Sequence, residues 1–407
     1  MDFLKEQDVV GFIVSLGASV VSEKLGGSPT EWKVKEVGDG NLNFIYLVQG
    51  TKDSVIVKTA PPFIRCIGES WPLTPSRISF EYLALEAESK VAPEHVPAIY
   101  HYDAQRHLII MQYMHPHIIL RKGLIQGIQY SDLADHLSTF LAQTLFKTSG
   151  FALKTPEKNK LVAQFSHNYD LCVVTEQVIF TEPFMKAKNN RWNSPYLDDD
   201  VTRIQEDGEL KIKISILKSK FQQHAEALIH ADFHTGSIMV TQTSTVAIDP
   251  EFAFYGPMAF DTGLLFANLF LSYFSQDGHG ERNHYKEWIL QVIQDTWNTF
   301  AFKFVELWDK EHTGDVFCPS FYNTKKDLEK VQQHFLLRLL QDTLGFAAAE
   351  IIRRIVGVAH VEDLEAIEDP IVRAQCEKKA LMFAREIAVN SEGCLSFTDV
   401  CHYATQV

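Results

Sequence analysis

The sequence predicts an α+β fold of two lobes, a small β-rich lobe over residues 1–114 and a large α-helical lobe over residues 115–407. The chain has 407 residues, which exceeds the length that one hydrophobic core usually supports. Strand-like segments gather in the first third, and long helical patterns fill the rest. The apolar fraction of 46% and charged fraction of 22% are those of an ordinary globular chain.

Alternating and β-branched segments predict the strands of the first lobe. They cover residues 31–37, 43–49, 54–59, 98–103 and 107–112. Residues 50–53 (Gly-Thr-Lys-Asp) have turn composition and join two of these strands in a hairpin. We expect one helix over residues 76–90, which ends before Pro93 and Pro97.

Long helical patterns predict the architecture of the second lobe. They cover residues 131–149, 210–225, 284–308, 324–356 and 371–391. The apolar stretch 264–274 is too short to span a bilayer and predicts a buried helix. Residues 237–241 and 245–249 predict two short strands. A small β-rich lobe before a large α-rich lobe is the gross pattern of the protein-kinase-like fold, although composition alone leaves other α+β architectures open.

Charge and cysteine usage limit the partners and the compartment. The net charge of −14 argues against nucleic acid or an anionic membrane as partner, because both favour a basic face. Six scattered cysteines without a C-x-x-C pair predict free thiols in a reducing compartment. The charged N-terminus lacks the apolar region of a signal peptide. We therefore expect a cytoplasmic protein.

The segment 230–261 carries the strongest chemical signal, and it begins His-Ala-Asp-Phe-His. Phosphoryl transfer needs a carboxylate that accepts the proton of the nucleophile, and further oxygens that hold Mg²⁺ against the phosphates. Asp232 lies in a tight loop and is the candidate base. Asp249 and Glu251 follow after a hairpin, and their i, i+2 spacing lets both carboxylates face one Mg²⁺ ion.

The nucleotide end of the predicted site is in the first lobe. A truncated glycine motif between two strands resembles a phosphate-covering loop, and the next strand supplies a lysine for the α- and β-phosphates. Glu81 is the preferred ion-pair partner of this lysine, and Glu86 is the alternative. The backbone that enters the second lobe would face adenine. The candidate ATP-binding residues are Gly38, Asp39, Gly40, Asn41, Asn43, Lys58, Glu81, Gln112, Tyr113 and Met114.

Other interpretations of these segments remain open. A lone Gly-x-Gly is more often a hairpin turn, and Lys58 could be a solubilising lysine on an edge strand. His230, Asp232 and His234 would share one face if they lay on a strand, which would suit a transition metal and a metallohydrolase. A nucleotide-binding protein without catalysis would require loss of the base or of the metal ligands.

The segment 230–261 resembles the catalytic and metal-binding segments of the aminoglycoside-phosphotransferase and choline-kinase superfamily. Ala231 replaces the usual glycine, and Ser237 stands where a metal-binding asparagine is usual. A serine hydroxyl or a bridging water would then complete the metal site. The resemblance implies structural roles for His230 and for Asp261, whose carboxylate would support the catalytic loop through backbone N–H groups.

Four segments are similar to the 5-methylthioribose kinase family: residues 38–44, 64–74, 117–124 and 249–257. The similarity extends from about residue 30 to about residue 390. It implies transfer of the ATP γ-phosphate to the C1 hydroxyl of 5-methylthioribose in methionine salvage, by a homodimer. A loop bearing Trp71 would cover the sugar, and the pair Arg353 and Arg354 would lie beside the sugar and the incoming phosphate.

The arginine pair has a physical interpretation of its own. Successive helical residues are about 100° apart, so we expect one of Arg353 and Arg354 to meet the substrate while the other orients it by ion-pairing. The alternative is that both cations favour the negative end of a helix. Trp71, Phe252 and Phe254 could form an apolar wall for the methylthio group. A choline, homoserine or aminoglycoside kinase is the competing prediction, but a cationic substrate would not favour two arginines.

Overall fold

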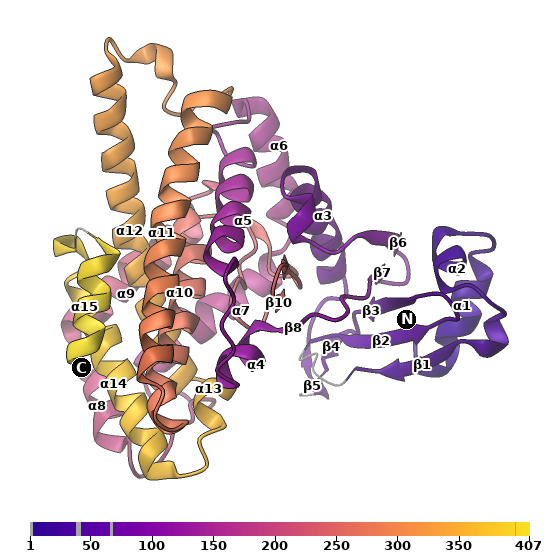
Figure 1. The fold of residues 1–407 in the computed structure, drawn as a ribbon, viewed down its shortest axis with the longest axis horizontal. Coiled ribbons are helices and arrows are strands. Elements are labelled where there is room, and N and C mark those ends of the chain that lie inside the picture. The colour runs from indigo at the N-terminus through magenta and orange to yellow at the C-terminus, as the bar shows by residue number, and fades with distance from the viewer. Residues whose placement is uncertain (1–2, 38–41, 66–67, 395) are drawn as a thin grey trace. The chain divides into compact units, whose positions relative to one another are not determined.

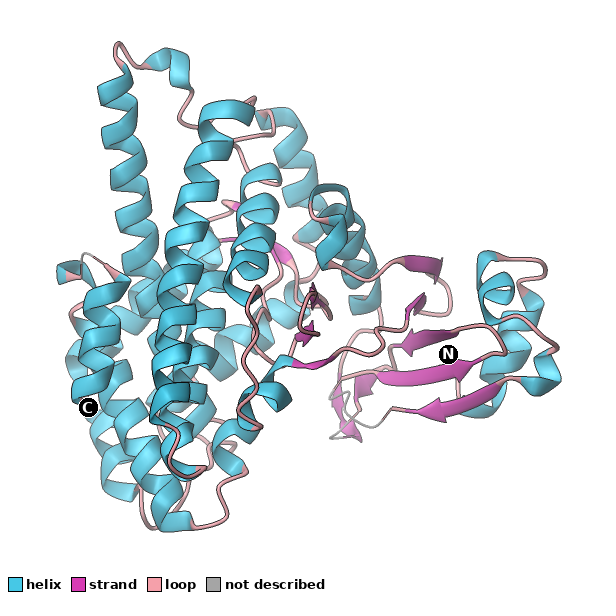
Figure 2. Ribbon diagram, in the orientation of Figure 1, coloured by secondary structure: helices cyan, strands magenta, loops and turns pink. Residues whose placement is uncertain are grey.

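The computed structural model describes residues 3–37, 42–65, 68–394 and 396–407. The chain forms two compact units. Unit 1 comprises Met1–His117 and Val246–Ala253, and unit 2 comprises Ile118–Thr245 and Phe254–Val407. The predicted α+β class is confirmed, because unit 1 contains a small antiparallel sheet and unit 2 is mostly helical (Figure 2). The division at residues 114 and 115 into two domains stays a prediction.

A five-stranded antiparallel sheet forms the centre of unit 1, in the order β1-β2-β3-β7-β6 (Figure 1). The strands are β1 (Lys33–Glu36), β2 (Phe44–Gln49), β3 (Ser54–Thr59), β6 (Ile99–Asp103) and β7 (Leu108–Gln112). The hairpin between β2 and β3 forms as predicted, with Gln49 opposite Ser54. Gly50 is required there, because a Cβ atom would lie 2.1 Å from the carbonyl oxygen of Leu25. A separate pair, β4 (Phe63–Ile64) and β5 (Gly68–Pro72), carries Trp71.

Helices complete unit 1. α3 (Arg77–Val91) is the predicted helix and begins within one residue of its expected start. Two short helices, α1 (Val9–Ser15) and α2 (Val20–Leu25), precede the sheet. Their apolar residues share one core with β2, β3 and β7, in a cluster that includes Val9, Phe12, Ile13, Val21, Leu25, Val48, Val55, Val57, Leu108 and Ile110. The segment from Val9 to Leu25 therefore contributes to the core of unit 1.

Five helices of unit 2 occupy the predicted segments. They are α5 (Leu133–Lys147), α9 (Gly208–Gln223), α11 (Asn283–Glu311), α12 (Lys325–Val356) and α14 (Pro370–Val389). The sequence did not predict α4 (Leu120–Ile125), α6 (Thr155–Phe165), α7 (Tyr169–Phe180), α8 (Asp198–Glu206), α13 (Glu362–Glu365) and α15 (Phe397–Gln406). α6 shows the reason, because Phe165 is its one buried residue and a helix without an apolar stripe has no recognisable periodicity.

The predicted buried helix at 264–274 is confirmed as part of α10 (Met258–Ser275), every residue of which is buried. α10 packs closely against α12, since a Cβ atom on Gly263 would lie 2.6 Å from Cβ of Phe346. Within the described ranges, no helix combines the length and apolarity that crossing a bilayer requires. The cysteines present as free thiols are Cys172, Cys318, Cys376, Cys394 and Cys401.

Short strands frame the predicted catalytic loop in unit 2. β9 (Ala227–Ile229) pairs with β12 (Phe254–Gly256), and β10 (Ile238–Val240) pairs with β8 (Ile118–Ile119). The loop that contains Asp232 therefore runs between two paired strands. The chain passes from unit 2 to unit 1 within β11 (Thr245–Ala247), so the segment with Asp249 and Glu251 belongs to unit 1.

Candidate active site

The catalytic loop is held by a buried carboxylate. Asp261, in the first turn of α10, accepts hydrogen bonds from the backbone N–H groups of His230 (2.7 Å) and Ala231 (2.8 Å). Burial raises the pKa of Asp261 to about 7, although these two N–H groups oppose the shift. Ala231 has φ of 62°, a left-handed conformation that costs an L-residue about 1–2 kcal/mol. Two bonds to Asp261 therefore hold a strained turn directly before Asp232.

His234 lies beside the candidate base. Its Nδ1 accepts a hydrogen bond of 2.9 Å from the backbone N–H of Gly236, so its proton is on Nε2. That Nε2 lies 3.4 Å from Oδ1 of Asp232. Burial, together with the positive charges of Arg354 and Arg121, holds the pKa of His234 well below its usual value. A neutral imidazole therefore directs an N–H group toward the Asp232 carboxylate.

The metal-strand interpretation of this segment does not fit the structure. Residues 230–234 are not a strand, and Ala231 is left-handed, so the alternate residues do not share one face. Ser237 is buried, and its hydroxyl lies 3.4 Å from Nδ1 of His234. Its role as a metal ligand stays a prediction.

Arg353 and Arg354 lie in the last turn of α12 and share one partner. Nε of Arg353 donates to Oε2 of Glu350, and Nε of Arg354 donates to Oε1, each at 2.6 Å. The sequence predicted an ion pair for one of the two arginines, whereas both pair with Glu350; which of them meets the substrate stays a prediction. Although successive residues point about 100° apart, i+3 and i+4 lie on either side of the same residue one turn earlier. Burial opposes the charge of Glu350, but the two arginines lower its pKa to about 2.

These residues belong to a larger arginine network that consists of Arg121, Asn268, Glu350, Arg353, Arg354 and Asp363. Nη2 of Arg121 donates to Oδ1 of Asn268 at 2.7 Å, and Nε of Arg121 lies 2.9 Å from Oδ2 of Asp363. Nδ2 of Asn268 lies 3.4 Å from Oε1 of Glu350. The sequence did not predict Arg121 as a site residue. The sequence feature that could have indicated Arg121 is its position directly after the apolar run 118–120, at the start of α4.

Both arginines keep donor groups outside this network. Within the part of the chain that the structure describes, the Nη atoms of Arg353 and Arg354 donate no hydrogen bond. Each side chain is 8% exposed. The network therefore fixes both guanidinium groups through Nε and leaves four Nη atoms for an anionic group.

Lys58 occupies the centre of the sheet in unit 1. β3 lies between β2 and β7, and Lys58 is 4% exposed, so the edge-strand interpretation is wrong. Nζ of Lys58 lies 2.7 Å from Oε2 of Glu81, and it also contacts Oδ1 of Asp249. The alternative partner, Glu86, pairs instead with Lys90 at 3.8 Å near the surface. Burial opposes the positive charge, but Asp249 and Glu81 hold the pKa of Lys58 above its usual value.

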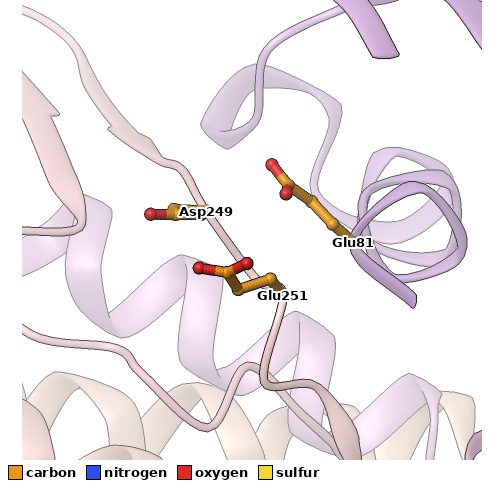
Figure 3. A group of neighbouring side chains, drawn as sticks. All are labelled: Glu81, Asp249 and Glu251. Carbon is orange, nitrogen blue, oxygen red and sulfur yellow. The ribbon is translucent and has the colours of Figure 1, made fainter. Parts of the chain in front are cut away.

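Three carboxylates converge beside Lys58. Glu81, Asp249 and Glu251 each offer an oxygen within 4.8 Å of the others; Figure 3 shows Glu81 on a helix and the other two on one loop. We call these three residues with Lys58 the acidic cluster. Burial and the charge of Asp249 raise the pKa of Glu251 to about 7, and burial raises that of Glu81 to about 8. Crowded oxygen donors of this kind suit a hard divalent cation.

Asn43 and Arg77 connect to this cluster. Nδ2 of Asn43 donates to Oε2 of Glu251 at 2.7 Å, and Oδ1 of Asn43 accepts from Nε of Arg77 at 3.0 Å. The sequence assigned Asn43 to the phosphate loop; its buried side chain contacts the Glu251 carboxylate, and a contact with ATP stays a prediction. It did not predict Arg77 at all. The remaining loop residues, Gly38, Asp39, Gly40 and Asn41, lie outside the described residues.

The remaining predicted residues belong neither to the acidic cluster nor to the arginine network. The backbone N–H of Gln112 donates to the carbonyl of Ala98 at 2.8 Å, and a contact of this residue with adenine stays a prediction. Tyr113 and Met114 follow after the end of β7. Trp71 is half-buried on β5. Phe254 packs against Phe221, with ring centroids 4.9 Å apart, so that ring belongs to the core of unit 2.

Comparison with known proteins gives consistent matches over most of the chain. Residues 33–292 match the APH phosphotransferase enzyme family. Methylthioribose kinase 1 of Oryza sativa subsp. japonica is 50% identical over 391 residues, which cover 94% of this chain and 90% of that protein. A methylthioribose kinase of Escherichia coli O45:K1 is 46% identical over 372 residues, covering 90% and 89% of the two chains. One from Geobacillus sp. (strain WCH70) is 39% identical over 380 residues, covering 92% and 91%. The chain belongs to the methylthioribose kinase family, within the APH phosphotransferases.

Proposed function

We propose that this protein transfers the γ-phosphate of ATP to the C1 hydroxyl of 5-methylthioribose, giving 5-methylthioribose 1-phosphate and ADP in methionine salvage. The observation that carries the proposal is the 50% identity to a methylthioribose kinase over 94% of the chain. The acidic cluster and the catalytic loop support it, because both have the chemistry that phosphoryl transfer requires.

Asp232 is the proposed base. Its carboxylate accepts the C1 hydroxyl proton while the C1 oxygen bonds to the γ-phosphorus and the bond to the leaving ADP oxygen breaks. The Nε2–H of His234, 3.4 Å from Oδ1, keeps the carboxylate oriented. Charge on the phosphoryl oxygens would be met by the Nη atoms of Arg353 and Arg354, which Glu350 holds in place.

Unit 1 is the proposed ATP and Mg²⁺ site. Asp249 and Glu251 would hold Mg²⁺, whose charge, when bound, offsets that of the β- and γ-phosphates. Lys58, oriented by Glu81, would contact the α- and β-phosphates. Residues 38–41, with the backbone of Tyr113 and Met114, complete the proposed nucleotide contacts, and Trp71 is proposed to cover the sugar. Ser237 is the proposed additional metal ligand.

We further propose that the protein is a cytoplasmic homodimer. The free cysteines and the net charge of −14 support the compartment. The family resemblance supports the dimer. Light scattering on the purified protein measures the oligomeric state, and a mass of one chain would contradict the dimer.

Substrate choice is tested by ATP consumption with Mg²⁺ and each of methylthioribose, ribose, choline, homoserine and an aminoglycoside. We expect turnover with methylthioribose and at most a trace with the others. Faster turnover of choline, homoserine or the aminoglycoside would overturn the proposed substrate. Replacement of Mg²⁺ by EDTA should abolish turnover, and persistence of turnover would overturn the metal assignment.

A further inference from the structure

Arg77 is a fully buried cation at the start of α3. Its exposure is 0%, and a buried guanidinium is costly unless its donors are satisfied. Burial accordingly lowers its pKa, and Glu251 opposes this shift. A position with this cost calls for a role that an apolar residue would not perform.

Four of the partners of Arg77 are backbone carbonyls. Nη1 donates to Pro61 at 2.9 Å, to Thr74 at 2.8 Å and to Leu73 at 3.5 Å, and Nη2 donates to Leu42 at 3.0 Å. Pro61 and Thr74 flank the β4–β5 hairpin that carries Trp71. Leu42 follows directly after the glycine-containing residues 38–41. One guanidinium therefore contacts the backbone at both ends of the Trp71 hairpin and at Leu42, shortly before β2.

A side-chain partner, Asn43, links Arg77 to the acidic cluster. Nε donates to Oδ1 of Asn43 at 3.0 Å, and Nδ2 of Asn43 donates to Oε2 of Glu251 at 2.7 Å. Nε also lies 3.6 Å from that Glu251 oxygen. All three residues are at most 4% exposed. The asparagine amide is thus oriented by a donor on one side and an acceptor on the other.

We propose that Arg77 and Asn43 are positioning residues that couple the cation-binding carboxylate Glu251 to the backbone directly before β2 and to the Trp71 hairpin. Neither residue needs to touch a substrate. The three segments share one guanidinium, so metal, nucleotide and sugar affinity depend on one another. This inference rests on the proposed function for the identity of those ligands.

The guanidinium geometry makes the proposal specific. Arginine presents its N–H donors in a rigid planar fork, whereas lysine presents a compact charge on a flexible chain. Arg77→Lys keeps a cation near Glu251 but cannot reach the four carbonyls together. Asn43→Leu keeps the contacts of Arg77 to those carbonyls and removes the bond to Glu251. Arg77→Lys therefore tests the contacts to the backbone carbonyls, and Asn43→Leu tests the contact to Glu251.

Calorimetric binding of ADP at a series of Mg²⁺ concentrations, with amide hydrogen exchange, tests the proposal. For Arg77→Lys we expect about tenfold faster exchange in residues 68–74 and weaker ADP binding. For Asn43→Leu we expect the Mg²⁺ concentration at half-saturation to rise about fivefold, with exchange in the hairpin unchanged. The double variant should weaken binding by less than the product of the single effects.

Arg106→Lys is the matched control, because Arg106 is exposed in the same unit and stacks over Phe12. Binding and exchange in folded Arg77→Lys equal to this control would overturn the proposal, as would an unchanged Mg²⁺ dependence in Asn43→Leu. If Arg77→Lys fails to fold, Asn43→Leu decides alone. Neither readout uses methylthioribose, so normal MgADP binding without phosphorylation of that sugar would refute the proposed function and leave this inference standing.

Steady-state kinetics distinguishes this coupling from a general loss of structure, because the two have different effects on KM and kcat. Arg77→Lys should raise KM for both ATP and methylthioribose about tenfold, with a smaller change in kcat, because it disturbs binding segments and leaves Asp232 untouched. A fall in kcat with both KM values unchanged would contradict the coupling.

Discussion

The pKa values of buried carboxylates shift in opposite directions in the two charged clusters of the molecule. In the acidic cluster of unit 1, burial raises the pKa of Glu81 to about 8 and that of Glu251 to about 7, and neighbouring carboxylates add to both shifts. In the arginine network of unit 2, Glu350 is equally buried, yet two arginines lower its pKa to about 2. Burial is common to both, so the sign of the neighbouring charge decides the outcome.

The difference has a chemical consequence. Carboxylates held close together with too little positive charge favour a cation, which removes their mutual repulsion. Arginines fixed by one carboxylate, with their outer Nη atoms unpaired, favour an anionic group. Unit 1 is therefore suited to a cation and unit 2 to an anionic group. Asp232→Asn and Glu350→Gln test this separation, and two further changes test burial and backbone strain.

Asp232→Asn should have the largest effect. An amide cannot accept the proton of the nucleophile, so we expect kcat to fall by about 10²–10⁴. MgADP binding to unit 1 should stay the same within error, because Asp232 belongs to unit 2. Coupled-assay kinetics and calorimetry measure the two quantities. Asp135→Asn, an exposed aspartate, is the control, and equal turnover in both variants would refute the base assignment.

Glu350→Gln should disrupt the arginine network. Two buried arginines lose their countercharge, and breaking such a pair costs about 3–5 kcal/mol of unfolding free energy. Chemical denaturation at pH 7 measures the loss. Glu306→Gln, which alters an exposed pair with Lys310, should change stability by less than about 0.5 kcal/mol. Similar values for the two variants would show that Glu350 is not the anchor.

The same variant has a defined pH signature. The pKa of Glu350 is about 2 in the folded state and 4.5 in its ordinary state, so its stabilisation is present above pH 4.5. It is lost as the pH falls from 4.5 toward 2, because the unfolded chain takes up the proton first. The wild type should therefore lose more stability than Glu350→Gln between pH 5 and pH 3. Parallel pH profiles would contradict the lowered pKa.

Glu377→Gln tests a buried carboxylate outside both clusters. Burial raises its pKa from 4.5 to about 7, opposed by Asn193 and Arg373. Between pH 4.5 and about 7 the folded state binds more protons than the unfolded state, so wild-type stability falls as pH rises. We expect the variant to gain on the order of 1–3 kcal/mol at pH 8 and little at pH 4.5.

Denaturant unfolding at the two pH values measures the effect of Glu377→Gln. Glu209→Gln, an exposed residue, is the control and should behave as the wild type at both. A stabilisation that does not change with pH would mean that Glu377 stays ionised in the folded protein.

Ala231→Gly should have the smallest effect on stability. It tests backbone strain, which can be compared between the loop in unit 2 and the Asp249 segment in unit 1. Asp249 and Ala231 are both left-handed, with φ of 69° and 62°, but aspartate tolerates this conformation better than alanine. Glycine would relieve a cost of about 1–2 kcal/mol and lose about 0.4–1 kcal/mol through chain entropy. We expect a net gain of roughly 0.5 kcal/mol in unfolding free energy.

Thermal unfolding of Ala231→Gly is best compared with Ala142→Gly, in the helical interior of α5. Glycine there should destabilise the protein by about 1 kcal/mol. Destabilisation by both changes would show that the turn at Ala231 is not strained.

Amphipathic patterns determined much of the fold from the sequence. The strands of the central sheet and five long helices carry apolar residues at regular spacing, because one face of each packs on a core. α6 lacks that spacing, because it has one buried residue. The short helices α1 and α2 have it, with Val9, Phe12 and Ile13 buried in α1, but six or seven residues are too few for a recognisable period. Contiguous motifs likewise identified Lys58, Asp232, Asp249 and Glu251 as candidates, since each lies in a segment whose residue types are themselves diagnostic.

Tertiary structure alone decided how these candidates are partnered. It selected Glu81 over Glu86, joined both arginines to Glu350, and brought Asn43 to Glu251 across 208 positions of sequence and Arg121 to Asn268 across 147. Such contacts leave no periodicity in the chain, because the distance between two side chains depends on how whole elements pack. The sequence by itself thus determined which groups can carry out phosphoryl chemistry. Packing determined which charges surround them, and with that their pKa values and orientation.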